Sequence, residues 1–199
     1  MPQSQPKQVE FFYDFTSPTA YLAWTRLPAI AQRTGAQIVY RPMFLGGVMQ
    51  TTGNRPPGMV AAKGKWMQAD LERWAKRFNT PFARNPHFPM MTLMVQRAAQ
   101  EWVARPDFDK YLAAIFNAAW RDGKNIADKD TLAAIVSGAG FSASDFFAAA
   151  ENPANKEKLK ATTDEAVARG VFGAPTFFVG DEMHFGQDRL DFVEEALAR

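Results

Sequence analysis

Hydrophobic and polar positions divide the start of this chain into alternating segments. Residues 9–15 (VEFFYDF) are mostly apolar with a strong strand preference, and residues 36–44 repeat that character. Between them, residues 18–34 carry apolar side chains at helical spacing, although Pro28 should bend this helix. Gly35 suits the C-terminal stop of a helix. The pattern therefore predicts strand–helix–strand, with the strands parallel if the helix is a crossover.

The middle of the chain is predicted to be mostly helical. Glycine and proline indicate a long loop that includes Gly46, Gly47 and residues 51–58, and a polar helix follows over residues 61–79. Residues 81–89 form an irregular, proline-containing connector. Further helical patterns cover residues 92–104, 108–121, 129–137 and 143–150.

The end of the chain returns to an alternating pattern. A helix is predicted over residues 154–169, a strand over 176–179, a hairpin partner over 183–185, and a last helix from Gln187 onward. Strand–helix–strand, a helical block and then helix–strand–strand–helix is the element order of a thioredoxin-like α/β fold with an all-helical insertion.

This order predicts how the chain divides into domains. We expect residues 9–45 and 151–197 to form one thioredoxin-like sheet domain, because the outer segments need one another to complete a single sheet. Residues 60–150 would form the helical insertion domain, and residues 1–8 a disordered tail.

Composition narrows the classes of function. The chain has 199 residues, 47% hydrophobic and 22% charged, which is ordinary for a soluble globular protein. Its 23 basic and 21 acidic residues leave a net charge of +2, so we expect no nucleic-acid partner. No apolar run approaches the roughly 20 residues that span a bilayer, and residues 1–10 lack the apolar core of a secretory signal. We therefore expect no membrane contact and a cytoplasmic location.

The chain contains no cysteine. This excludes disulfides, cysteine nucleophiles, thiolate metal sites and dithiol redox motifs. The only histidines, His87 and His184, have no neighbouring ligand pattern, so no metal site is expected. If the protein performs thiol chemistry, a small molecule must supply the thiol.

The most informative stretch is where the first strand ends. Ser17 and Pro18 form a strong helix-start signal, because the serine oxygen can accept from an orphan amide and proline is well suited to the first turn. Ser17 would then hold a hydroxyl at the positive end of a helix dipole, where anions and thiolates are stabilised. The alternative is that Ser17 is an N-cap and nothing more.

The second informative stretch is VFGAPTFFVG, residues 171–180. Pro175 precedes a strand, and taken alone it indicates a stiffened strand entry. The arrangement resembles thioredoxin-like proteins, in which this X–Pro bond is cis and faces the start of the first helix. There the backbone of the preceding residue, here Ala174, pairs with the cysteinyl part of a bound peptide. Where disulfide oxidoreductases of this fold carry Cys-x-x-Cys, this chain has SPTA (residues 17–20), so disulfide exchange is excluded.

Motifs along nearly the whole chain resemble the 2-hydroxychromene-2-carboxylate isomerases and their relatives, the kappa-class glutathione transferases. They are DFTSPTAY (14–21), TGNRPP (52–57), KGK (63–65), FNAAW (116–120), GAPT (173–176) and FGQDR (185–189). The resemblance implies a thioredoxin-like, DsbA-related fold with a helical insertion, glutathione as cofactor, and a homodimer.

The resemblance also implies roles for single residues. Ser17 would meet the glutathione sulfur as the catalytic residue, Asn54 would bond the tripeptide, and Lys63 would approach from the facing helix. Gln187 and Asp188 would hold the γ-glutamyl end, the aspartate answering its ammonium group. Without the resemblance, Asn54 is an ordinary turn residue, Lys63 a solvated charge and Asp188 a favourable first-turn acid. The remaining residues expected at the glutathione site are Thr19, Ala174 and Pro175.

Simple energetics support the role of Ser17. A thiol with a free pKa of about 8.5 is mostly protonated at neutral pH. A helix terminus contributes roughly 0.3–1 kcal/mol, which is less than the about 1.36 kcal/mol that corresponds to one pKa unit. The dipole alone is therefore insufficient, and a hydrogen bond from Ser17 has to supply much of the effect.

Three functions remain open at this point. The resemblance implies a glutathione-dependent isomerase that interconverts 2-hydroxychromene-2-carboxylate, an aromatic carboxylate, with trans-o-hydroxybenzylidenepyruvate in aromatic catabolism. A kappa-like transferase would activate the same thiolate but release a conjugate, and residues 54–57 and 63–65 look at least as kappa-like as isomerase-like. A non-enzymatic thioredoxin-like binding module is the third. A set of apolar side chains could line an aromatic substrate pocket, although each is more often plain core: Trp66, Trp74, Phe78, Phe82, Phe88, Met90, Met91, Met94 and Trp120.

Overall fold

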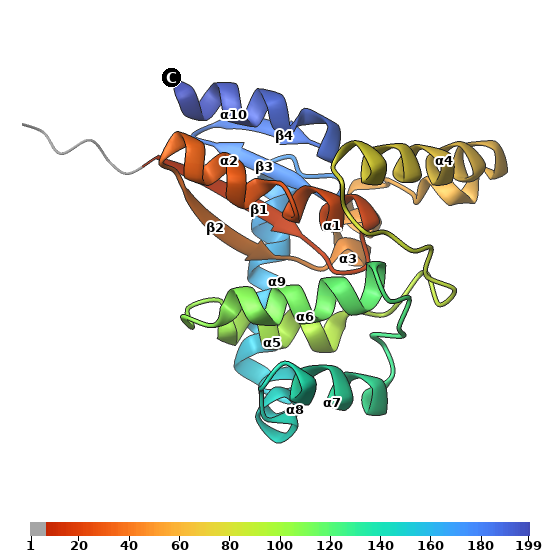
Figure 1. The fold of residues 1–199 in the computed structure, drawn as a ribbon. Coiled ribbons are helices and arrows are strands. Elements are labelled where there is room, and N and C mark those ends of the chain that lie inside the picture. Colours follow the sequence, from red (N-terminus) through yellow and green to blue (C-terminus); the bar gives the residue numbers. More distant parts are fainter. Residues whose placement is uncertain (1–6) are drawn as a thin grey trace, which may run out of the picture.

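The computed structural model describes residues 7–199, which are organised around one four-stranded sheet with strand order β2-β1-β3-β4 (Figure 1). The predicted tail lies largely outside the described residues, but Gln8, which it included, is the first residue of β1. The parallel pairing of β1 with β2 is confirmed, and β3 runs antiparallel to both β1 and β4. The strands are β1 (Gln8–Tyr13), β2 (Gln37–Pro42), β3 (Thr176–Val179) and β4 (Glu182–Phe185).

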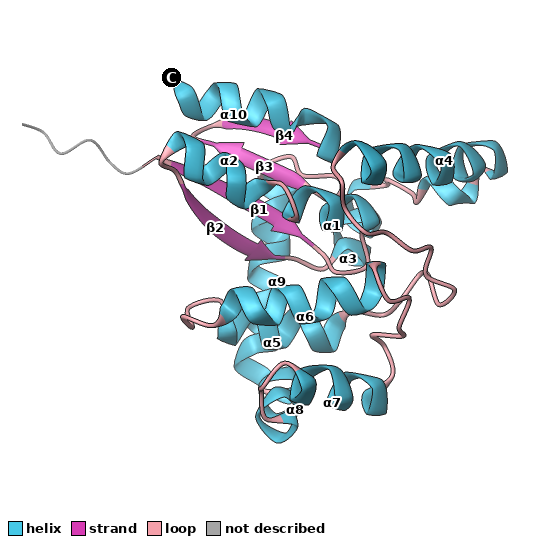
Figure 2. Cartoon of the chain, in the orientation of Figure 1, coloured by secondary structure: helices cyan, strands magenta, loops and turns pink. Residues whose placement is uncertain are grey.

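Helices cover both faces of this sheet, and helices α5 to α8 form a helical block beside it (Figures 1 and 2). The α-helices are α1 (Pro18–Trp24), α2 (Leu27–Thr34), α3 (Leu45–Thr52), α4 (Ala61–Arg77), α5 (Leu93–Trp102), α6 (Phe108–Trp120), α7 (Lys129–Gly138), α8 (Ala143–Glu151), α9 (Pro153–Ala168) and α10 (Leu190–Ala198). Short 3₁₀ turns are η1 (Pro57–Met59) and η2 (Gln187–Arg189). The fold class predicted from the sequence, thioredoxin-like α/β with a helical block between its two halves, is confirmed.

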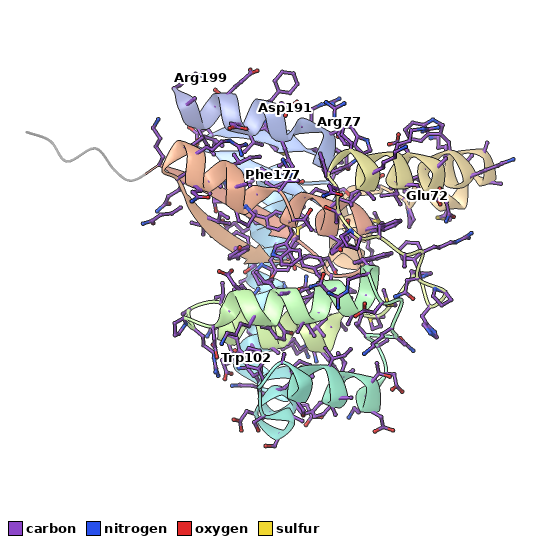
Figure 3. The ribbon with its side chains drawn as sticks, viewed as in Figure 1. Glu72, Arg77, Trp102, Phe177, Asp191 and Arg199 are labelled. Atoms are coloured by element: carbon purple, nitrogen blue, oxygen red, sulfur yellow. The ribbon has the colours of Figure 1, made fainter. Side chains whose placement is uncertain are left out.

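Strand β1 is buried on both faces, which explains why its apolar residues run without alternation. Phe11 and Tyr13 belong to a large core shared with α1, α2 and α10, and Phe177 of β3 points into the same layer (Figure 3). Phe12 and Phe178 face the other side and pack with α3 and α9. The sheet therefore lies between two layers of helices.

The large core continues into the helical block without a break. Phe15 contacts Phe116 of α6 and Tyr111, with ring centroids 4.7 Å and 5.9 Å apart. Farther along, Trp102 stacks on Phe141 at 5.0 Å, between α5 and the α7–α8 pair (Figure 3). Buried aromatic contacts thus join the sheet to the helical block. That residues 60–150 form a domain of their own stays a prediction.

Two predicted elements differ from the structure. The helix expected over residues 18–34 is two helices, and Pro28 lies in the first turn of α2. The loop expected at Gly46 and Gly47 is wrong, because both residues lie in α3. A Cβ at Gly46 would lie 2.8 Å from the Phe44 ring, so glycine here allows a close approach of the helix to that ring. Tertiary packing overrides the loop preference of glycine, because Leu45 and Val48 of this helix are buried with Ala166 of α9.

Candidate active site

Ser17 stands where β1 gives way to α1. Its amide donates to the Asp14 carbonyl at 3.0 Å, which closes a turn after the strand. Its hydroxyl accepts from the Ala20 amide at 3.1 Å, and Pro18 occupies the first helical position, so the predicted N-cap is confirmed. Only 3% of Ser17 is exposed. The sequence thus holds a nearly buried hydroxyl at the positive end of a helix.

The opposite wall of the site is the Ala174–Pro175 peptide, which is cis. The Ala174 carbonyl accepts from Ser17 Oγ at 3.0 Å and from Thr19 Oγ1 at 2.9 Å. The two hydroxyl oxygens lie 2.9 Å apart. Residues 155 or more positions apart therefore meet in one cluster of hydroxyl and carbonyl oxygens.

Asn54 and the 187–188 pair approach this cluster through the backbone. Asn54 donates from Nδ2 to the Phe172 carbonyl at 2.7 Å, two residues before Ala174. The Gly186 amide donates to the Pro175 carbonyl at 3.0 Å, which brings the start of η2 beside the cis peptide. The structure thus gathers both segments around the same edge of the sheet.

Gln187 and Asp188 differ in their surroundings within η2. Gln187 is buried, whereas the Asp188 carboxylate is exposed and pairs with Arg189 at 2.8 Å. Gly186 has a φ of +102°, and a side chain there would collide with the Asp188 carboxylate. Glycine is therefore required where the chain turns into η2.

Lys63 lies apart from this cluster in the described part of the chain. It is exposed in the first turn of α4, and within residues 7–199 no hydrogen bond or ion pair involves its ammonium group. Helix α4 projects from the body of the molecule (Figure 1), and Glu72 and Arg77 on it are exposed. Lys63 could therefore act together with the cluster only through a bound ligand that reaches both.

The nine apolar side chains proposed for a substrate pocket separate into three groups, of which the half-buried one consists of Trp74, Phe78, Phe82 and Met94. Trp120 and Met90 are core residues, 3% and 6% exposed. Trp66, Phe88 and Met91 are at least half exposed, which is unusual for such large apolar side chains. These three are thus the ones available to an external partner.

Asp14 is a functional candidate that sequence reasoning passed over. Its carboxylate is fully buried and accepts from the Thr16 amide at 3.0 Å, the Leu45 amide at 2.8 Å and Thr92 Oγ1 at 2.6 Å. Burial raises its pKa, and these hydrogen bonds oppose the rise by stabilising the charged form. An acid that interrupts a buried apolar strand was the signal that could have found it.

Trp120, a core residue, also makes a hydrogen bond that the sequence did not predict. Its indole nitrogen donates to the Phe15 carbonyl at 2.8 Å, two residues before Ser17. The FNAAW motif at the end of α6 therefore supplies a hydrogen bond to the turn that carries Ser17.

The candidate site has no metal-ligating character. Across residues 7–199, no group of three histidine, cysteine, aspartate or glutamate side chains is arranged to hold a metal ion. Over the same residues, no helix is both long enough and apolar enough to cross a membrane.

A family model described as the DSBA-like thioredoxin domain matches residues 8–198. The chain belongs to this DSBA-like thioredoxin family. Among its relatives, a 2-hydroxychromene-2-carboxylate isomerase from Sphingobium xenophagum is 32% identical and aligns over 96% of this chain and 98% of its own length. One of the same name from Pseudomonas putida is 36% identical over 96% of this chain and 94% of its own length.

Other DSBA-like relatives are transferases. The human protein named glutathione S-transferase kappa 1 is 27% identical over 96% of this chain and 91% of its own length.

A solved structure of a 2-hydroxychromene-2-carboxylate isomerase matches with a TM-score of 0.88 at 31% identity, covering 96% of this chain and 95% of that chain. The resemblance stated from the sequence motifs is therefore confirmed: the relatives are isomerases and glutathione transferases.

Proposed function

We propose that this protein is a glutathione-dependent isomerase acting on 2-hydroxychromene-2-carboxylate or a similar aromatic acid. The observation that carries the proposal is a hydroxyl, that of Ser17, at the N-terminus of α1 against the Ala174–Pro175 peptide, in a chain without cysteine. A thioredoxin-like site of this kind can favour a thiolate but cannot provide one.

The residues present fit glutathione. When bound, glutathione would supply a thiolate able to add reversibly to the conjugated side chain of the substrate, so that a double bond becomes a rotatable single bond. Ser17 would donate to the sulfur, and the backbone amide of Ala174 would pair with the cysteinyl residue in the manner of a strand edge, while its carbonyl stays with the hydroxyl groups. Thr19 and Pro175 complete this wall.

The two ends of the tripeptide would be held by groups around the same edge of the sheet. Asn54 carries an amide suited to the peptide backbone of glutathione, and Lys63 a cation suited to a carboxylate. Gln187 and the Asp188 carboxylate are suited to the γ-glutamyl end, where the ammonium group could take the place of Arg189 as the partner of Asp188. These four side-chain roles, and that of Ser17, are part of the proposal.

The Ser17 hydroxyl has to rotate before it can donate a hydrogen bond to the glutathione sulfur. In the structure Ser17 Oγ donates to the Ala174 carbonyl, which Thr19 Oγ1 also reaches at 2.9 Å. Thr19 can therefore keep that carbonyl paired while the Ser17 hydroxyl rotates toward a thiolate. The exchange replaces a neutral hydrogen bond by a charge-assisted one, which is about twice as strong.

A homodimer and a cytoplasmic location belong to the same proposal. Exposed apolar side chains at the projecting end of α4 and in η1, those of Met59, Val60 and Trp66, support an interface there. The exposed Phe88 and Met91 are suited to an aromatic substrate.

A kappa-like transferase is the second candidate, because the human relative carries that name. Mass spectrometry after turnover separates the two functions. An isomerase returns glutathione unchanged with an isomerised acid, whereas consumed glutathione and a stable adduct would reject the isomerase. Calorimetry tests the third reading: no heat with millimolar glutathione would favour a binding module without enzymatic activity.

A further inference from the structure

The turn that carries Ser17 is held at its central peptide. Residues 14–17 form a four-residue turn closed by the hydrogen bond from the Ser17 amide to the Asp14 carbonyl, 3.0 Å. The peptide between Phe15 and Thr16 is the middle one of this turn. Its carbonyl accepts from Trp120 Nε1 at 2.8 Å, and its amide donates to Asp14 Oδ1 at 3.0 Å.

Such a peptide is the part of a turn that normally rotates. Type I and type II turns differ by a flip of the central peptide, which changes the path of the chain on both sides. Here a flip would break the hydrogen bonds at both ends of one peptide plane. Ser17 follows immediately, so the position of its hydroxyl depends on the orientation of this peptide.

Both holding groups are themselves fixed by the rest of the fold. The Asp14 carboxylate accepts from Thr92 Oγ1, just before α5, and from the Leu45 amide at the start of α3. The Trp120 ring is 3% exposed and stacks on Phe82, with centroids 6.2 Å apart. The helical block therefore reaches across to the turn through Thr92 and Trp120.

We propose that Trp120 and Asp14 are positioning residues for Ser17, acting through the Phe15–Thr16 peptide. They meet neither glutathione nor substrate in this scheme. The effect on the glutathione thiol rests on the proposed function, whereas the effect on the turn does not. The helical block would thus fix the orientation of the Ser17 hydroxyl.

The test compares Trp120→Phe with a matched control, Tyr111→Phe. The first removes the indole donor and keeps an aromatic ring. The second removes another buried aromatic donor, whose hydroxyl bonds the Val95 carbonyl at 2.6 Å inside the helical block. Amide hydrogen exchange by NMR in the free protein should be faster at Thr16 in Trp120→Phe by about tenfold, the change that loss of one buried hydrogen bond implies. Tyr111→Phe should leave exchange at Thr16 unchanged, and equal exchange at Thr16 in the two variants would overturn the proposal.

The second readout is the pKa of glutathione's thiol in the complex, followed by thiolate absorbance in the ultraviolet. Trp120→Phe should raise this pKa and Tyr111→Phe should not. Faster exchange at Thr16 with an unchanged thiol pKa would also overturn the positioning role. If the wild-type protein binds no glutathione, the proposed function fails, and exchange at Thr16 still decides whether the turn is held as described. Should Trp120→Phe not fold, Thr92→Val tests the Asp14 side of the proposal, because it removes the hydroxyl that anchors Asp14: exchange at Thr16 should again be faster, and unchanged exchange would overturn the proposal.

Discussion

Replacing Thr19 with valine tests whether Thr19 frees the Ser17 hydroxyl to donate its hydrogen bond to the glutathione sulfur. The Ala174 carbonyl accepts from both hydroxyls, at 3.0 Å from Ser17 and 2.9 Å from Thr19. In the proposed function, Thr19 would keep this carbonyl paired while the Ser17 hydroxyl turns toward a glutathione thiolate. Valine has nearly the same shape but no hydroxyl, so the carbonyl would compete with the thiolate for the single Ser17 proton.

The size of the effect follows from the energy of one hydrogen bond. An unsatisfied buried acceptor costs about 1–3 kcal/mol. Thr19 is partly exposed, so water can reach its side of the carbonyl, and the lower end of that range applies. At about 1.36 kcal/mol per unit, the pKa of the bound thiol should rise by roughly 0.7 unit in Thr19→Val.

Ultraviolet titration of the complex measures this pKa directly. Thr19→Ser is the matched control, because it keeps the hydroxyl and loses only a methyl group, and it should titrate as the wild type does. The explanation is wrong if Thr19→Val and Thr19→Ser give the same thiol pKa. Glutathione affinity measured by calorimetry on the same samples separates weaker binding from weaker ionisation.

Three further predictions concern single side chains. Ser17→Ala should reduce kcat strongly and lower the free energy of unfolding by about 1 kcal/mol, because an N-cap is lost; undiminished turnover would remove Ser17 from catalysis. Asp14→Asn should lower the free energy of unfolding by about 2 kcal/mol in denaturant titration, because an amide group cannot accept from all three donors around it, and a wild-type midpoint would contradict this. Burial holds the pKa of His184 below 6.5, so the unfolded chain binds more protons below that pH, and stability should fall as pH decreases through 6.5. His184→Gln should flatten this part of the stability profile, and an unchanged profile would show that another group causes the fall.

The sequence was sufficient for those parts of the fold that local patterns determine. The strand run at residues 9–15 and the Ser17–Pro18 start signal correspond to β1 and α1, because apolar runs and caps act within a few residues. The same holds for the hairpin of β3 and β4. Helix α3 was missed because the contacts that hold it come from distant segments: Leu45 and Val48 are buried with Ala166 of α9, and the Leu45 amide donates to the Asp14 carboxylate.

The site divides in the same way. Ser17, Thr19 and Ala174 were expected together on resemblance, and the structure brings their polar atoms into contact. Nothing local could connect Trp120 with Phe15, since 105 residues separate them. Asp14 was visible as an odd acid in an apolar strand, but its partners come from two other segments and only the folded chain reveals them.

The lack of cysteine would affect how such an enzyme withstands oxidation. A catalytic thiol that belongs to the polypeptide can be driven by peroxide to sulfinic or sulfonic acid, and the whole molecule is then lost. Here the sulfur would belong to a small, freely exchanging peptide, and the chain contributes only alcohols and amides around it. Damage to the nucleophile would end with the departure of one glutathione molecule, and the next to arrive would restore the site.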